Sequence, residues 1–292
     1  MNIVFHLGVH CTDGGLLMRS LLQNRAALAE DGIGVPGPLR YRELLGETST
    51  SLRGDVAPPE TEALILSRIA PVPDTERVVL SNENFLCRSQ VALGRDCLYP
   101  KAMKSAWLRN CVPSHDVEFA IALRNPACFL PDLVAGHGGP PPPHDMLAEG
   151  VFLDDLLWSD VIWRIAEANP TSRITAWCHE DTPFIWPQIQ RELTGLDPTR
   201  TLDGGLDMAE TIMTSEGYAR LTGFLESRNV GTEDRRRRAI AAFLEAHAIE
   251  HEIETEIDLP GWTDETVETL TTLYETDVAE IARMPNVNFI SP

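Results

Sequence analysis

A glycine-rich turn near the start of the chain has the composition of a loop that binds phosphate. A mostly apolar, strand-like segment at residues 2–7 leads into Gly8, and the turn continues to Gly14 and Gly15 before an amphipathic pattern begins at Leu16. A strand, a glycine-rich loop and a helix N-terminus in this order direct several backbone N–H groups to one point, which is how proteins hold phosphate. The turn contains no lysine, so a phosphate bound there would lack its usual side-chain cation.

Two residues near this turn could act as a base. Three further apolar segments have the composition of buried strands, namely residues 77–81, 116–123 and 174–178. Glu83 follows the first of them and is the best candidate for removing a proton from a hydroxyl group, and His10 in the turn is the second candidate. Two other interpretations stay open, because Glu83 could cap a helix or pair with Arg88, and His10 could be an ordinary loop histidine.

The strand-like segments alternate with segments of helical periodicity. Apolar residues recur at helical spacing in residues 16–30, 59–70, 99–111, 152–168 and 184–193. This alternation predicts an α/β fold in which a mainly parallel sheet is flanked by helices. Ligands of such sheets bind outside the carboxyl ends of the strands, so we expect the turn and the polar residues after the other strands to line one pocket.

The last third of the chain differs from the rest. From about residue 200 to 292 no strand is predicted, and the apolar pattern is helical around 214–228, 233–247 and 263–283. We therefore predict one α/β domain with a mostly helical C-terminal region. The run from Pro140 to Pro143 predicts an exposed loop, and the run from Arg235 to Arg238 predicts a solvated helix face.

The charge of the chain restricts its partners. The chain has 44 acidic and 24 basic residues and a net charge of −20, which repels nucleic acid and anionic lipid. An anionic small molecule would therefore need a local positive pocket. No apolar run reaches the ~18 residues that span a bilayer, and no signal-peptide pattern is present, so we expect a cytoplasmic protein.

The cysteines indicate neither a metal site nor a redox pair. The six cysteines show no Cys-x-x-Cys spacing, and we predict no metal site. Scattered cysteines are usually buried apolar residues, but Cys11 lies in the glycine-rich turn, where the N-terminus of the following helix could lower the pKa of its thiol.

Several segments, in their order along the chain, resemble the sulfotransferases that use 3′-phosphoadenosine-5′-phosphosulfate (PAPS). Residues 6–15 are similar to the family pattern His-Ile-Gly-x-x-Lys-Thr-Gly-Thr-Thr, and further motifs are similar to residues 80–85, 123–126 and 177–183. The resemblance implies a P-loop-like sulfotransferase architecture and transfer of a sulfuryl group from PAPS to a hydroxyl group of a small molecule or carbohydrate. It also implies that PAPS is held by Cys11, Thr12, Asp13, Gly14, Gly15, Leu16, Arg124 and Asp132.

Two positions of this implied cofactor site depart from the family pattern. Cys11 stands where the family has lysine, and Asp132 stands where the family has a serine that binds the 3′-phosphate. A thiol cannot replace an ammonium group, and Asp13 adds a negative charge where a phosphate is expected. We expect Asp132 either to pair with Arg124 or to repel the ligand.

Three functions stay open at this point. The first is a sulfotransferase, and the second is a non-catalytic member of the same fold that binds a ligand or a protein. The third is a P-loop nucleotide hydrolase or kinase. This third function fits least, because the Walker pattern has four residues between its glycines and then a lysine, whereas five residues separate Gly8 from Gly14 and no lysine follows.

Overall fold

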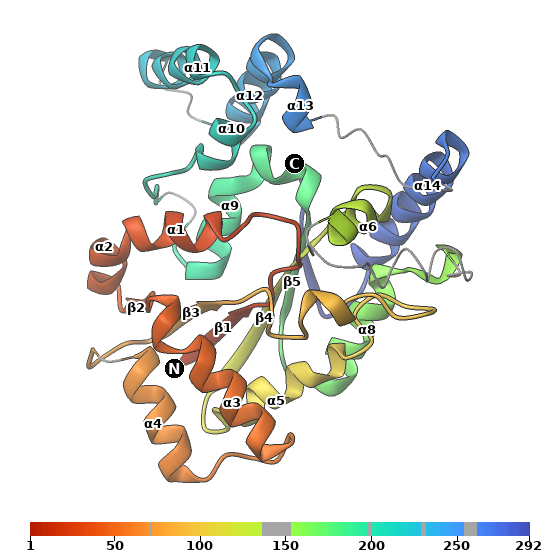
Figure 1. Ribbon diagram of the computed structural model, residues 1–292. Coiled ribbons are helices and arrows are strands. Elements are labelled where there is room, and N and C mark those ends of the chain that lie inside the picture. The colour runs from red at the N-terminus through yellow and green to blue at the C-terminus, as the bar shows by residue number, and fades with distance from the viewer. Residues whose placement is uncertain (71, 136–152, 198–199, 229–231, 254–261) are drawn as a thin grey trace.

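The computed structural model describes all residues except 71, 136–152, 198–199, 229–231 and 254–261, and its strands form one parallel sheet (Figure 1). The strand order is β2-β3-β1-β4-β5-β6. In this register Phe5 pairs with Leu80 on one side and with Phe119 on the other. The strands are β1 (Asn2–His6), β2 (Ile33–Gly34), β3 (Arg77–Ser81), β4 (Asp116–Leu123), β5 (Ile174–Cys178) and β6 (Val287–Ile290).

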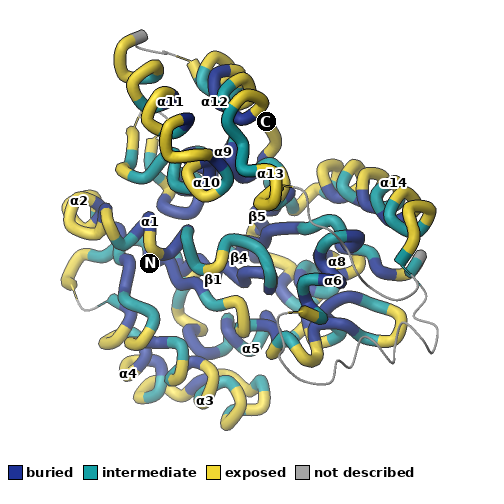
Figure 2. The backbone as a smooth tube through the Cα atoms, turned by 45° about the horizontal axis from the view of Figure 1, so that its top comes forward, coloured by how far each residue is buried: buried dark blue, intermediate teal, exposed yellow. Residues whose placement is uncertain are grey.

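Helices cover both faces of the sheet. One layer contains α3 (Arg42–Leu52), α4 (Pro59–Ile69), α5 (Ser105–Asn110), α6 (Pro126–Ala135), α8 (Trp158–Ala168) and α14 (Asp264–Ile281). The opposite layer contains α1 (Leu16–Gln23), α2 (Arg25–Glu30) and α9 (Thr182–Thr194). Alternate side chains of a strand point to opposite faces, so Ile3 and Phe5 pack in the first layer and Val4 in the second. Figure 2 shows the central strands buried between helices that expose their outer sides.

A smaller core joins the helices of the C-terminal region. It lies among α10 (Asp207–Thr211), α11 (Ser215–Arg228) and α12 (Glu233–His247), which are followed by α13 (Glu250–Ile253). In α12, Arg236 donates to the carbonyl of Gly205 at 2.8 Å, and Arg237 donates to Oε1 of Gln188 at 2.7 Å. The prediction of a solvated face is therefore wrong for these two arginines, which hold α12 against its neighbours.

The predicted parallel sheet with flanking helices is confirmed. The predicted strands are present, but β6 lies in the C-terminal region, where the sequence predicts none, and β2 is a further short edge strand. The single helix predicted over 16–30 is two helices that meet at Asn24, and the helix predicted over 99–111 is only Ser105–Asn110 after a short 3-10 turn. The proline run lies outside the described residues. No described helix combines the length and apolarity needed to cross a membrane.

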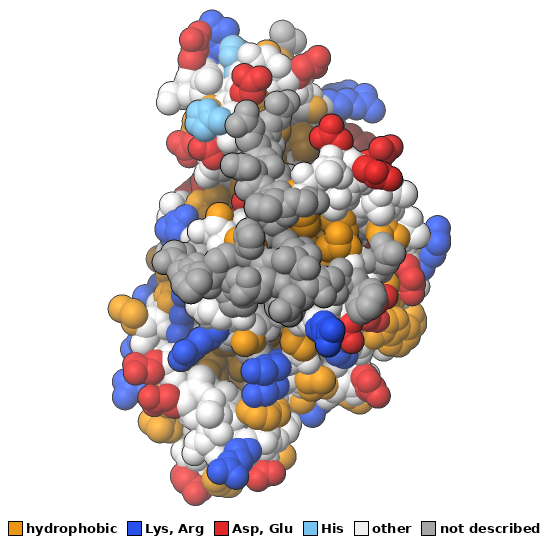
Figure 3. Space-filling view, turned by 45° about the vertical axis from the view of Figure 1, so that its right-hand side comes forward, with side chains coloured by type: hydrophobic (Ala, Val, Ile, Leu, Met, Phe, Trp, Pro, Cys, Tyr) orange, Lys and Arg blue, Asp and Glu red, His pale blue; other side chains and the backbone are white. Residues whose placement is uncertain are grey.

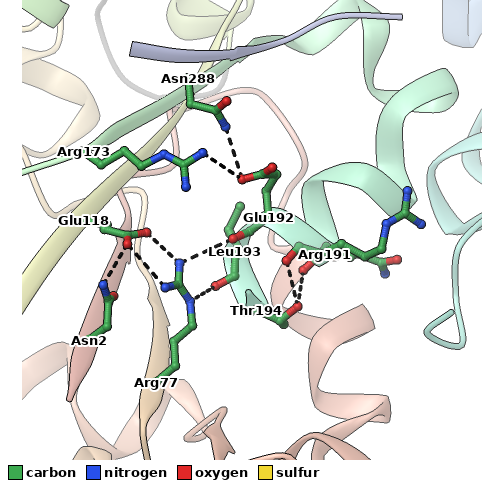
Figure 4. Close-up of polar contacts among 10 residues, drawn as sticks. Asn2, Arg77, Glu118, Arg173, Arg191, Glu192, Leu193, Thr194 and Asn288 are labelled. Carbon is green, nitrogen blue, oxygen red and sulfur yellow. Dashed lines mark hydrogen bonds and ion pairs between the residues drawn. The ribbon is translucent and has the colours of Figure 1, made fainter. Parts of the chain in front are cut away.

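A polar network joins the amino ends of the strands, opposite to the edge where ligands of such sheets bind (Figure 4). Arg77 at the start of β3 pairs with Glu118 of β4 at 2.6 Å and also donates to the carbonyl of Leu193 at 2.8 Å. Asn2 of β1 donates to the same carboxylate at 2.7 Å. Burial by itself would raise the pKa of Glu118, but the hydrogen bonds and charge of Arg77, helped by Asn2, outweigh it, and the pKa is lowered.

We expect Glu118→Gln to destabilise the fold in a pH-dependent way. A carboxyl group with a lowered pKa in the folded state contributes stability above its unfolded pKa and loses it as pH falls through the folded value. The loss should be about 1–2 kcal/mol at pH 7 and should shrink toward zero below about pH 4. Urea unfolding at both pH values measures it, with Glu192→Gln as a control because its ion pair with Arg173 is longer, at 3.3 Å, and more exposed. An equal loss at both pH values would contradict the prediction.

Candidate functional site

The carboxyl ends of four neighbouring strands meet at one edge of the sheet. The segments after β1 and β3 lie against each other, since the backbone N–H of Asn82 donates to the carbonyl of His6 at 3.2 Å. Gly8 has a φ of 75°, and a Cβ built on it would lie 2.6 Å from Cα of Glu83. Only glycine fits this close approach. The fold thus brings the glycine-rich turn and Glu83 together, as the sequence predicts.

The turn from β1 to α1, which we call the β1–α1 loop (residues 7–15), engages the side chains of Thr12 and Asp13 in hydrogen bonds to the chain's own backbone. Oδ2 of Asp13 accepts a hydrogen bond from the backbone N–H of Leu17 at 2.8 Å, and the carbonyl of Asp13 accepts one from Leu16 at 2.9 Å. The hydroxyl of Thr12 donates to the carbonyl of Val9 at 2.7 Å. Asp13 thus places a carboxylate at the N-terminus of α1, where an anion would bind.

Arg124, at the end of β4, is also engaged within the chain. Its Nη2 pairs with Oδ2 of Asp132 at 2.5 Å, and its Nη1 donates to the carbonyl of Cys11. Trp158 donates from Nε1 to the carbonyl of Arg124 at 2.8 Å, which fixes the backbone there. The expected pairing of Asp132 with Arg124 is therefore confirmed.

Cys11 is not an activated thiol. Burial raises the pKa of its thiol to about 11, the charge of Arg124 opposes the rise, and the carboxylates of Asp132 and Glu83 add to it. The alternative in which the helix N-terminus lowers this pKa is therefore wrong, and the thiol is not activated. The physical reason is that Cys11 is half-buried and lies near the carboxylates of Asp132 and Glu83, and both effects penalise a thiolate.

His10 is held by a buried tyrosine on a distant segment. The hydroxyl of Tyr99 accepts from the backbone N–H of His10 at 3.0 Å, and it lies 2.8 Å from Nδ1 of the same residue. The other ring nitrogen, Nε2, lies 3.4 Å from Oδ1 of Asn84. Both ring nitrogens of His10 thus face polar atoms of the chain itself, so His10 is held in place by Tyr99 and Asn84.

Glu83 is exposed beside this histidine. Within the described part of the chain it has no hydrogen bond or ion pair, so neither helix capping nor the alternative pairing with Arg88 is present there. An exposed carboxylate next to the loop can accept a proton from a hydroxyl group that approaches it, but no neighbouring side chain orients it for that task.

The segment after β5 connects neighbouring elements. Oε1 of Glu180 accepts from the backbone N–H of Asn125 at 2.8 Å, and Oε2 accepts from the hydroxyl of Tyr274 in α14 at 2.9 Å. Burial and the nearby charge of Arg124 lower the pKa of His179, so this imidazole is neutral near pH 7. The described residues contain no group of three or more His, Cys, Asp or Glu that could hold a metal ion.

A large cleft opens beside the β1–α1 loop, between α3, the segment after β3 and α5. It has a volume of about 1070 Å³ and includes Asn82 and Asn84 in its wall. Its lining contains Arg42, Arg88, Lys101 and Lys104, and we call it the cationic cleft. Among the described residues that line it, only Glu47 is acidic. This cleft provides a local positive pocket in a protein of net charge −20.

Sequence reasoning does not find Tyr99 or the residues of the cationic cleft. Tyr99 gives no local signal, because its partner His10 is 89 residues away. The basic residues come from three separate segments, and only the fold shows that they share one wall. Family models, curated proteins and solved structures were compared with this chain, and none of them matches it.

Proposed function

We propose that this protein binds a ligand without catalysing sulfuryl transfer, and that it does so on a sulfotransferase-like architecture. The observation that carries the proposal is the carboxylate of Asp13, which accepts a hydrogen bond from Leu17 at the N-terminus of α1. A phosphate bound there would have to displace this carboxylate or lie against its negative charge.

The residues of the implied cofactor site do not fit PAPS. Thr12 and Arg124 would have to exchange their internal partners for phosphate oxygens, and Asp132 would repel the 3′-phosphate. Cys11 supplies no positive charge to balance the charge that develops on the leaving phosphate. A nucleotide hydrolase or kinase would also have to bind phosphate at this loop, against the carboxylate of Asp13 and without a lysine.

A titration with adenosine 3′,5′-bisphosphate tests the proposal on the unaltered protein. By calorimetry we expect a dissociation constant above about 1 mM. We also expect that about 1 mM nucleotide does not shift the midpoint of thermal unfolding. Inorganic sulfate serves as a control for binding of any anion. Micromolar binding of the nucleotide would contradict the proposal and favour the sulfotransferase instead.

A further inference from the structure

The positive side chains of this acidic protein are unevenly distributed. The chain has only two lysines, Lys101 and Lys104, and both line the cationic cleft. Figure 3 shows Lys and Arg side chains gathered, beside hydrophobic ones, on the lower half of the face that it draws. In a chain with 44 acidic residues, the two lysines would be expected to form ion pairs with carboxylates. Among the described residues, however, neither lysine has an ion pair.

The two arginines of the cleft are likewise without ion pairs among the described residues. Nε of Arg42 donates to the carbonyl of Ser81 at 3.0 Å, which anchors this side chain at the cleft wall. Arg88 is exposed at the cleft wall. Cations that share a wall repel one another, so they destabilise the free protein unless an anion lies between them.

Aromatic side chains line the same cleft. Nζ of Lys104 lies 3.9 Å from the centroid of the Trp107 ring, and this contact holds the ammonium group at the wall. Phe85 and Leu86 add apolar surface to the lining. An inorganic ion would use only the charges, whereas an organic anion would contact both kinds of surface.

We propose that the cationic cleft binds an organic anion that carries several negative groups on an apolar or aromatic frame. The number of unpaired cations, the volume of about 1070 Å³ and the aromatic lining fit such a ligand better than a single small ion. The proposal rests on the proposed ligand-binding function and adds its site and ligand class. The cleft proposal and the proposed absence of sulfuryl transfer can be refuted separately, because binding in the cleft is measured with a probe that contains no nucleotide.

Two probes on one ring test this proposal. Benzene-1,2,4,5-tetracarboxylate carries several negative groups, whereas benzoate carries one. We expect the tetracarboxylate to bind with a dissociation constant below about 100 µM at low salt, at least tenfold tighter than benzoate, and to weaken strongly in 0.5 M NaCl because salt screens exposed charges. No binding of the tetracarboxylate, or equal binding of both probes, would overturn the proposal.

A pair of matched variants locates the site. Arg88→Gln with Lys101→Gln removes two exposed cations from the cleft, and we expect at least tenfold weaker binding of the tetracarboxylate. Arg68→Gln with Arg238→Gln changes the net charge equally at exposed positions outside the lining, and its affinity should stay within about twofold of the unaltered protein. Circular dichroism checks that both variants are folded. An equal loss in both pairs would assign the binding to overall charge and overturn the cleft as the site.

Discussion

Combining Cys11→Lys, Asp13→Gly and Asp132→Ser is expected to create a binding site for adenosine 3′,5′-bisphosphate. Removal of the Asp13 carboxylate frees the backbone N–H of Leu17, and removal of the Asp132 carboxylate frees Nη2 of Arg124. Each charge-assisted contact to phosphate contributes about 1.5–3 kcal/mol, which is roughly tenfold to a hundredfold in affinity. We therefore expect the triple variant to bind the nucleotide at least about a hundredfold tighter than the unaltered protein in calorimetry.

The three substitutions should act non-additively. Asp132 and Glu83 lie close enough to Cys11 to raise the pKa of its thiol, so a lysine introduced there alone would pair with these carboxylates instead of with a ligand. Cys11→Lys should gain affinity only together with Asp132→Ser. Asp13→Gly alone should lower the free energy of unfolding by about 1 kcal/mol, because α1 loses a capping carboxylate.

One further substitution controls the experiment. Arg124→Ala in the triple variant should remove the part of the gain that comes from Asp132→Ser, since that substitution acts by releasing Arg124 from its ion pair. An unchanged affinity in the folded triple variant would mean that the β1–α1 loop and Arg124 do not form a nucleotide site even without the two carboxylates. That result would leave ligand binding elsewhere as the better account of the protein.

The fold could be predicted because its signals are local. Strands β1, β3, β4 and β5 contain nearly continuous apolar runs, which are typical of buried parallel strands. Strand β6 carries an asparagine among four residues at the edge of the sheet, and β2 has only two residues, so neither gives a clear pattern. Pairing with a neighbour, not local composition, makes these two segments strands.

The candidate site could be predicted only in part. The sequence places the β1–α1 loop, Glu83 and Arg124 at one edge because parallel strands end there, and it predicts the negative effect of Asp13. It does not show that the Asp13 carboxylate caps α1, because that depends on the path of the loop. The cationic cleft is invisible in the sequence, since its basic residues belong to segments joined only by tertiary packing.

The second large effect is expected for Gly8→Ala. The φ of Gly8 is 75°, and a Cβ there would lie 2.6 Å from the backbone of Glu83, which cannot rotate away as a flexible side chain can. Strain in the left-handed region and overpacking against the backbone add up, so we expect a loss of about 2–4 kcal/mol in the free energy of unfolding measured with urea. Since the total stability of a domain is about 5–15 kcal/mol, this is a large fraction.

Two other glycines separate the causes of this loss. Gly14 has a φ of 55°, but a Cβ at this position would meet no atom within 4 Å, so Gly14→Ala should show the strain alone, about 1 kcal/mol. Gly46 lies in α3 with ordinary helical backbone and equally open space, so Gly46→Ala should stabilise the protein by about 0.5–1 kcal/mol. If Gly8→Ala cost no more than Gly14→Ala, the segments after β1 and β3 would not be in contact. The placement of Glu83 and the β1–α1 loop side by side at one edge of the sheet would then be wrong.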